Sequence, residues 1–326
     1  MNNKIGPIRN SQDEIVENNK QPADLLNNYF ASVFTQEDVS SVPEPVDIFD
    51  DSQSECLSTL EIEEILVLDK LSKINVNKCH GPDELHAKIL FEIKHEIAKP
   101  LTKSFNHSLE TGIVPQDFRD AYVCPLYKKG NKEQAENYRP VSLTSIVGKT
   151  LESIIKDSVV QFLEEHNLLR NTQHGFTSGR SCLTNLLEFF ESVTKELDDG
   201  NNVDLVYLDF CKAFDKVPHL RLIRKMEALG IRGRIKTWVE NWLRNRRQRV
   251  CVDGEFSDWV EVSSGVPQGS VLGPVLFLIY INDLDNGLLS KLGKFADDSK
   301  LCKGVNNTID AGILASDLAQ LEKWSN

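Results

Sequence analysis

The sequence has no long hydrophobic segment. Its longest apolar run, residues 275–281 (VLFLIYI), is far shorter than the roughly 20 residues that a membrane-spanning helix requires. The N-terminus also lacks the charged-then-apolar pattern of a secretory signal. We therefore expect neither a membrane segment nor a secretory address.

Cysteine is scarce and shows no pairing pattern. The seven cysteines are widely spaced, with no Cys-x-x-Cys pair and no histidines at zinc-finger spacing. This pattern argues against a disulfide framework and against a structural zinc site. It predicts reduced thiols in an intracellular protein.

The sequence also lacks the net positive charge typical of proteins that bind nucleic acid. The formal net charge is −12, but residues 21–69 contain twelve Asp or Glu and no Lys or Arg, so elsewhere 37 acidic residues face 37 basic ones. Residues 221–249 carry ten Lys or Arg against two Glu. Such a stretch either tracks a phosphate backbone or forms a solvated surface, and charge alone does not separate the two.

Hydrophobic periodicity predicts a mixed α+β architecture without internal repeats. Apolar residues recur at helical spacing over residues 151–163, 183–197 and 314–321, and the first two stretches predict long core-facing helices. Strands are expected at residues 203–210 and in two hairpins, one turning at Asp253-Gly254 and one at Asp297-Asp298. The polar, acidic residues 1–56 are interpreted as a largely disordered linker. Further along the chain, we expect a helix to start near Ser270.

Three aspartates are the candidate catalytic groups. Asp209 ends a mostly apolar strand, and Asp297 and Asp298 lie at the expected hairpin turn. Adjacent acids at a turn are usually only turn formers, but carboxylates brought close together require either raised pKa values or bound cations. Oxygen ligands favour Mg²⁺ or Mn²⁺, and two such ions about 4 Å apart serve in-line phosphoryl transfer.

The motifs around these aspartates carry a resemblance to a known family. Residues 207–219 (YLDFCKAFDKVPH), 264–274 (SGVPQGSVLGP) and 295–298 (FADD) resemble, in order, the palm motifs of reverse transcriptases from non-LTR (LINE-like, jockey-like) retrotransposons. Upstream segments resemble the fingers motifs of that family: 81–83 (GPD), 125–130 (PLYKKG), 137–143 (NYRPVSL), 173–176 (QHGF) and 179–181 (GRS). The resemblance covers residues 57–326. Two departures, at residues 78–80 (KCH) and 176–179 (FTSG), touch no carboxylate.

The resemblance implies a right-hand polymerase fold. It assigns residues 57–200 to a helical fingers region and residues 201–326 to a palm, whose antiparallel sheet is backed by helices and carries the carboxylates. The thumb is missing, so we expect the chain to be truncated inside a longer protein. A full-length element of this family normally carries an endonuclease and a thumb, and it acts in the nucleus and cytoplasm.

The resemblance also implies roles for single residues. Asp209 and Asp297 would bridge two Mg²⁺ ions, with Mn²⁺ as a substitute, Asp298 would assist, and the carbonyl of Phe210 would complete a coordination sphere. Phe214 would lie under the incoming sugar and exclude a 2′-hydroxyl, unless it is an ordinary core aromatic. The remaining nucleotide-binding candidates are Lys128, Lys129, Arg139, Gln268 and Gly269.

Physical reasons support these nucleotide-binding candidates. The guanidinium of Arg139 suits phosphate oxygens, and a lysine adds a point charge. Gln268 and Gly269 precede a helix whose first amides are expected to face the nucleotide. Asp215 is interpreted as a turn-forming residue rather than a metal ligand.

The predicted function is RNA-directed DNA polymerisation by a mobile element. The expected partners are an RNA template, a DNA primer and dNTPs. An RNA-templated RNA polymerase is disfavoured, because it would have a small residue in place of Phe214. The other alternative is a truncated, inactive or co-opted remnant that binds nucleic acid without polymerising.

Overall fold

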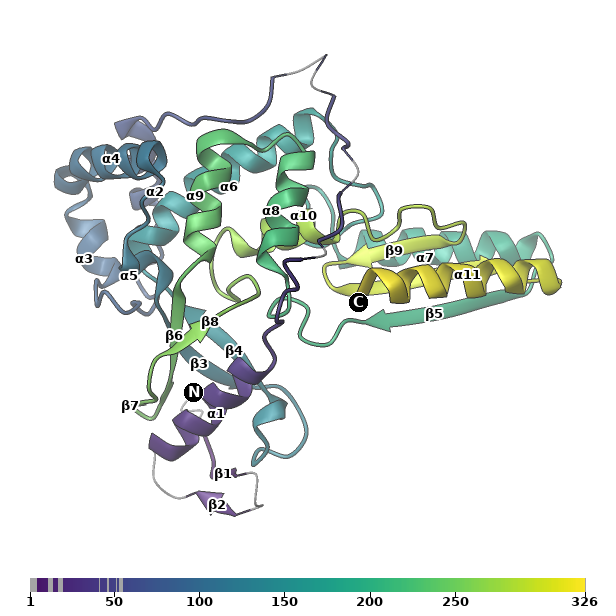
Figure 1. Ribbon diagram of the computed structural model, residues 1–326, viewed down its shortest axis with the longest axis horizontal. Coiled ribbons are helices and arrows are strands. Elements are labelled where there is room, and N and C mark those ends of the chain that lie inside the picture. The colour runs from purple at the N-terminus through teal and green to yellow at the C-terminus, as the bar shows by residue number, and fades with distance from the viewer. Residues whose placement is uncertain are drawn as a thin grey trace. The chain divides into compact units, whose positions relative to one another are not determined.

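A computed structural model describes residues 5–10, 14–16, 20–40, 42–45, 47–50, 52 and 55–325 (Figure 1). The chain forms two compact units. One comprises Met1–Glu165 and Phe214–Pro274, and the other comprises His166–Ala213 and Val275–Asn326. Each unit is assembled from two separate stretches of chain. The expected division into a linker (1–56), a fingers region (57–200) and a palm (201–326) stays a prediction.

The first unit contains a five-stranded sheet. Its strands are β3 (Ala121–Tyr127), β4 (Tyr138–Leu143), β6 (Arg246–Val252), β7 (Glu255–Phe256) and β8 (Val260–Val262). The order is β4-β3-β6-β7, with β8 also paired to β6, and only the β3–β6 pair is parallel. The predicted hairpin at Asp253-Gly254 is confirmed, and positive φ angles of 49° and 93° at these residues match a tight hairpin turn.

The N-terminal segment contains regular structure packed on this sheet. Helix α1 (Lys20–Ser32) buries Leu26 and Phe30 in one cluster with Val123 of β3 and Val250 of β6. Two short strands, β1 (Ile8–Arg9) and β2 (Ile15–Val16), pair antiparallel. The expectation of a largely disordered linker over residues 1–56 is therefore wrong for α1, because its few apolar residues share one buried helix face. Several other positions of this segment lie outside the described residues.

Helices make up the remainder of the first unit. They are α2 (Glu64–Ser72), α3 (Ala87–Glu92), α4 (Lys94–Thr111), α5 (Gln116–Arg119), α6 (Ile146–Glu165), α8 (His219–Ala228) and α9 (Gly233–Leu243), with a 3₁₀ turn at Ala135–Asn137. The predicted helix over residues 151–163 is confirmed as part of α6, and its apolar face is buried. Trp238 and Trp242 of α9 are fully buried with their rings stacked 6.2 Å apart. This unit therefore has buried apolar side chains among these helices as well as between α1 and the sheet.

The second unit contains a three-stranded antiparallel sheet in the order β5-β10-β9. The strands are β5 (Val203–Asp209), β9 (Lys291–Phe295) and β10 (Asp298–Gly304). Helices α7 (Cys182–Asp198) and α11 (Thr308–Ser325) run along this sheet (Figure 1). The predicted second hairpin is confirmed, although its turn is Ala296-Asp297, one residue earlier than expected. The predicted C-terminal helix is also confirmed. A further helix, α10 (Gly273–Ile281), begins three residues later than the expected start near Ser270.

The apolar stripe of α7 does not face a core. Leu183, Leu187, Phe190 and Leu197 are 54–64% exposed, and Asn185 is the buried residue of the helix. The helix over residues 183–197 is confirmed, but its expected core-facing orientation is wrong. Polar contacts hold α7 to the sheet instead: Asn185 accepts from Lys300 Nζ at 3.3 Å, and Lys291 Nζ donates to Ser192 Oγ at 2.5 Å.

The structure also bears on the state of the cysteines and on membrane-spanning helices. All seven cysteines are free thiols in the described part of the chain. Among the helices described, none is both long and apolar enough to cross a membrane.

Candidate functional site

Strand pairing brings two of the three candidate carboxylates together. In the β5–β10 register Asp209 lies directly opposite Asp298. Side chains opposite each other in an antiparallel pair point to the same face, with Cβ atoms about 4.5–5.5 Å apart. Both residues are exposed. The strand ends therefore present two like charges side by side to solvent, which is an arrangement that attracts a cation.

The third carboxylate lies in the adjoining turn. Ala296 and Asp297 form the two-residue loop between β9 and β10, and Asp297 is half-buried. Ala296 has φ +55°, a left-handed conformation that non-glycine residues adopt at a cost. Loop geometry, and not the strand ladder, thus sets where the Asp297 side chain lies.

The donor set suits a hard divalent cation. Within the described residues, no three His, Cys, Asp or Glu side chains lie close enough together to hold a metal ion. Mg²⁺, however, is usually held by one or two carboxylates together with substrate phosphates and water, and the opposed pair Asp209 and Asp298 meets that requirement. The two-ion arrangement and the carbonyl ligand from Phe210 remain predictions.

Two predicted phosphate-binding residues lie at the β3–β4 pair in the first unit. Arg139 of β4 lies opposite Leu126 of β3, and Lys128 directly follows the last residue of β3, with its amide donating to the Asn137 carbonyl at 2.9 Å. Lys128, Lys129 and Arg139 are all exposed. Lys128 and Arg139 therefore each present a cationic side chain to solvent close to the end of the β3–β4 pair.

The loop with Gln268 and Gly269 packs tightly on the end of β4. The amide of Ser142 donates to the carbonyl of Gln268 at 2.7 Å. Gly269 has φ +124°, and a Cβ there would lie 2.4 Å from the Ser142 carbonyl oxygen. Glycine is required at this position for both reasons. The amide of Val266 in turn donates to the Phe214 carbonyl at 2.8 Å, so the loop also fixes the backbone of Phe214.

Asp215 holds this loop through hydrogen bonds within the first unit. Its buried carboxylate accepts from Gln268 Nε2 at 3.0 Å on each oxygen, and its carbonyl accepts from Ser264 Oγ at 2.7 Å. This agrees with the expected turn-forming role. The Nε2 group of half-buried Gln268 and its backbone carbonyl are therefore both engaged within the protein.

The expectation that the first amides of the helix after Gly269 face a nucleotide is wrong. The amides of Val271 and Leu272 donate to Glu152 Oε2 at 2.7 and 3.2 Å, and Gly273 donates to Ser270 Oγ at 3.0 Å. A buried carboxylate thus accepts from the two amides that directly precede α10, where the helix was expected to have begun. Glu152 is not among the site residues predicted from the sequence, although an acid on the apolar face of a predicted helix indicates a special role.

Glu152 is paired electrostatically with a buried arginine. Both Glu152 and Arg246 are almost completely buried. Burial raises the pKa of Glu152 and lowers the pKa of Arg246 to about 10, while each charge acts to keep the other ionised. Glu152 Oε1 and Arg246 Nη1 have no hydrogen-bond partner among the described residues. The pair is therefore held by charge and by the helix amides.

Three arginines of the basic stretch 221–249 are engaged within the protein. Arg246 is buried, Arg247 donates to Asp120 at 2.6 and 3.1 Å, and Arg249 packs against three aromatic rings at 4.1–4.7 Å. These contacts orient the side chains towards protein groups. The count of basic residues in this stretch therefore overstates the cationic groups that are available to a phosphate backbone, and the choice between phosphate tracking and a solvated surface stays open.

His219 provides a pH-dependent contact with the same loop. Its Nε2 donates to the Gly265 carbonyl at 2.8 Å, and burial lowers the pKa of His219 below its ordinary value. A lowered folded-state pKa contributes stability above the unfolded pKa of about 6.5, and this stability is lost as pH falls.

When the pH is lowered from 7.5 to 5, we expect the urea midpoint of unfolding to fall less in His219→Gln than in the natural chain. The exposed control His95→Gln should keep the natural fall; equal falls in all three proteins would contradict the assignment.

The match to a known protein family covers the motifs at residues 207–219, 264–274 and 295–298. The family described as Reverse transcriptase (RNA-dependent DNA polymerase) matches residues 127–324. The chain is 27% identical over 285 residues to a probable RNA-directed DNA polymerase from transposon BS of Drosophila melanogaster, covering 85% of this chain and 31% of that protein. It is 28% identical over 247 residues to the corresponding X-element protein of the same species, covering 73% and 26%.

A third relative supports the same assignment. The RNA-directed DNA polymerase from mobile element jockey of Drosophila melanogaster is 27% identical over 229 residues, covering 70% of this chain and 25% of that protein. The chain therefore spans about a quarter to a third of the length of these relatives. The resemblance to the polymerases of non-LTR mobile elements is confirmed over most of the chain. Because the family match covers more than half of its residues, this chain belongs to the reverse transcriptase (RNA-dependent DNA polymerase) family.

Proposed function

We propose that this chain is the polymerising segment of a mobile-element reverse transcriptase, which extends a DNA primer with dNTPs on an RNA template. The observation that carries the proposal is the exposed Asp209–Asp298 pair at the strand ends of a reverse transcriptase family member. In this proposal the three-stranded sheet is the palm. The part of the chain that carries Lys128 and Arg139 corresponds to the fingers.

The proposed reaction is attack of the primer 3′-hydroxyl on the α-phosphate of a dNTP, with pyrophosphate as the leaving group. Bound divalent cations would supply charge neutralisation on the reacting phosphate and lower the pKa of the attacking hydroxyl. Asp209, Asp297 and Asp298 would hold these cations. Arg139 and Lys128 would bind the triphosphate through charge-assisted hydrogen bonds.

A primer-extension assay tests the proposal directly. The purified chain is given an oligo(dT) primer on a poly(rA) template with dTTP and Mg²⁺, and extended product is measured with and without excess chelator. We expect chelator-sensitive extension that is stronger on the RNA template than on a matched DNA template. Binding of the primer–template without extension, at any concentration of Mg²⁺ or Mn²⁺, would instead favour the remnant that only binds nucleic acid.

Sugar selection provides a second test, because Phe214 follows the catalytic strand by five residues and its backbone is fixed by Val266. Replacing Phe214 with Val removes the ring that would fill the space of a 2′-hydroxyl. We expect the ratio of ribonucleotide to deoxyribonucleotide incorporation to rise by at least about tenfold, equivalent to about 1.4 kcal/mol of discrimination.

The control for this test is Phe210→Val. Phe210 is also half-buried, and its ring lies 6.0 Å from that of Trp324, so the variant loses an aromatic ring elsewhere. It should keep the natural sugar preference whatever happens to its overall rate. An unchanged ratio in Phe214→Val would assign Phe214 to ordinary packing.

A further inference from the structure

Gln173 is a buried polar residue next to the turn that carries Asp297. It belongs to the second unit and is 3% exposed. Its segment runs parallel to β9, where Gln173 forms a bridge with Lys294. The amide of His174 donates to the Lys294 carbonyl at 2.9 Å, and the Lys294 amide donates to the Thr172 carbonyl at 2.8 Å. Residues 172–174 thus extend the sheet beyond β9.

The Gln173 side chain binds both backbone groups of Ala296. Its Oε1 accepts from the Ala296 amide at 2.9 Å, and its Nε2 donates to the Ala296 carbonyl at 3.3 Å. Residues of a two-residue hairpin loop lie outside the strand ladder, so their buried peptide groups need such partners. Gln173 Oε1 also accepts from the Gly175 amide at 2.8 Å, which fixes the orientation of the side-chain amide.

The backbone after Gln173 touches the same turn. A Cβ on Gly175 would lie 2.3 Å from the Ala296 nitrogen and 3.0 Å from its Cα. Glycine is therefore the residue that allows the two backbones to approach this closely. Ala296 has a left-handed φ of +55°, a conformation that persists where the surrounding structure holds it. Gln173 and Gly175 together supply that constraint.

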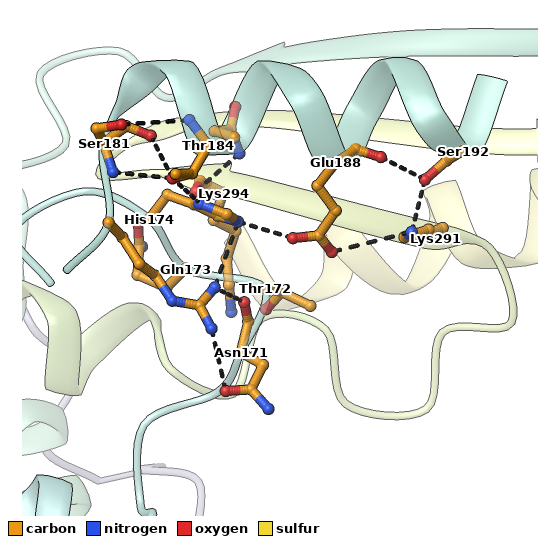
Figure 2. A network of polar contacts seen from close by, with 12 residues as sticks. Asn171, Thr172, Gln173, His174, Ser181, Thr184, Glu188, Ser192, Lys291 and Lys294 are labelled. Atoms are coloured by element: carbon orange, nitrogen blue, oxygen red, sulfur yellow. Dashed lines mark hydrogen bonds and ion pairs between the residues drawn. The ribbon is translucent and has the colours of Figure 1, made fainter. Parts of the chain in front are cut away.

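A polar network anchors this segment to α7 and β9 (Figure 2). His174 contacts Thr184 Oγ1 at 2.9 Å and Glu188 Oε2 at 3.0 Å, both on α7. The side chain of Lys294 is fully buried and donates to Asp285 Oδ1 at 3.0 Å. Polar contacts thus hold His174, which follows Gln173, and Lys294, which pairs with Gln173, and together they fix the position of Gln173 relative to β9.

We propose that Gln173 is a positioning residue that fixes the Ala296–Asp297 turn and thereby sets where the carboxylates of Asp297 and Asp298 lie. Gly175 allows the approach that this contact requires. The inference rests on the proposed function for its catalytic consequence. Its structural part, the hold on the turn, stands independently of catalysis.

The first test measures the turn itself. In Gln173→Met, which keeps the length of the side chain and removes both hydrogen-bonding atoms, we expect amide hydrogen exchange of the peptide covering Ala296 to accelerate at least tenfold. The matched control is Gln320→Met, the same substitution on an exposed residue of α11 whose amide donates to Asn286. It should leave the exchange of the Ala296 peptide unchanged.

The second test measures cation binding without catalysis. Binding of Mn²⁺ is followed by electron paramagnetic resonance in the natural chain, Gln173→Met, Gln320→Met and Asp209→Asn. We expect Gln173→Met to bind Mn²⁺ about tenfold more weakly and Gln320→Met to bind it normally. In primer extension, kcat should fall at least tenfold in Gln173→Met while the KM for dTTP changes less than threefold.

The outcomes separate this inference from the proposed function. If the natural chain binds no Mn²⁺ and extends no primer, the proposed function fails, whereas faster exchange at Ala296 in Gln173→Met still supports the hold on the turn. If the natural chain is active and Gln173→Met matches it in exchange, Mn²⁺ binding and kcat, the inference is overturned. Should Gln173→Met fold poorly, Gly175→Ala provides the same readouts by displacing the turn through its new Cβ.

Discussion

Replacing Asp209 with Asn is expected to lower the rate of primer extension by at least about 10³-fold, equivalent to about 4 kcal/mol of lost transition-state stabilisation. The physical reason is that the substitution keeps the shape of the side chain and removes one of two opposed negative charges at the strand ends. Asn is a much weaker ligand for a hard cation than a carboxylate. Asp298→Asn should have the same direction of effect, and single-nucleotide incorporation under saturating Mg²⁺ provides the measurement.

The matched control is Asp204→Asn on the same strand. Asp204 is also exposed but lies five residues earlier, opposite Lys303. Its activity should stay within about twofold of the natural chain. Asp209→Asn should in addition be no less stable towards urea, because it relieves repulsion between like charges that face each other. Retention of more than a tenth of the natural activity in Asp209→Asn would remove this residue from the catalytic site.

Replacing Glu152 with Ala is expected to lower the free energy of unfolding by about 3–5 kcal/mol. The substitution removes the strongest opposing charge from the buried Arg246 guanidinium and leaves the amides of Val271 and Leu272 without an acceptor. Urea denaturation followed by circular dichroism measures the change. The control Glu164→Ala removes an exposed acid from the same helix and should change the free energy of unfolding by less than about 0.5 kcal/mol.

A second variant separates charge from capping. Glu152→Gln keeps an oxygen for the two helix amides and removes the charge that faces Arg246. Because burial raises the folded-state pKa of Glu152, the stability contributed by this carboxyl is full below its unfolded pKa of about 4.3 and is lost as pH rises through the folded pKa. As the pH rises from about 4.3, the free energy of unfolding should therefore fall less in Glu152→Gln than in the natural chain. A Glu152→Ala variant as stable as Glu164→Ala would contradict the role assigned to this pair.

Local sequence patterns predicted several secondary-structure elements, including the hairpin that carries Asp297 and Asp298. The Asp253-Gly254 hairpin follows from residues that tolerate positive φ, and the hairpin at Asp297-Asp298 follows from two short apolar runs around a turn. The helix over residues 151–163 follows from apolar spacing alone. The opposition of Asp209 and Asp298 was expected only from the resemblance, since no local pattern specifies how strands distant in sequence pair.

The sequence by itself determined the order of motifs, the identities of the charged groups and the local elements that present them. Tertiary structure alone decided three matters: Glu152 binds the amides before α10 that the sequence predicted to face a nucleotide, Gln173 holds the turn at Ala296, and the apolar stripe of α7 remains exposed. The reason is physical. Helices and tight turns are specified by neighbouring residues, whereas a buried polar group is satisfied by whatever partner the folded chain brings near it, here from more than 100 residues away in both cases.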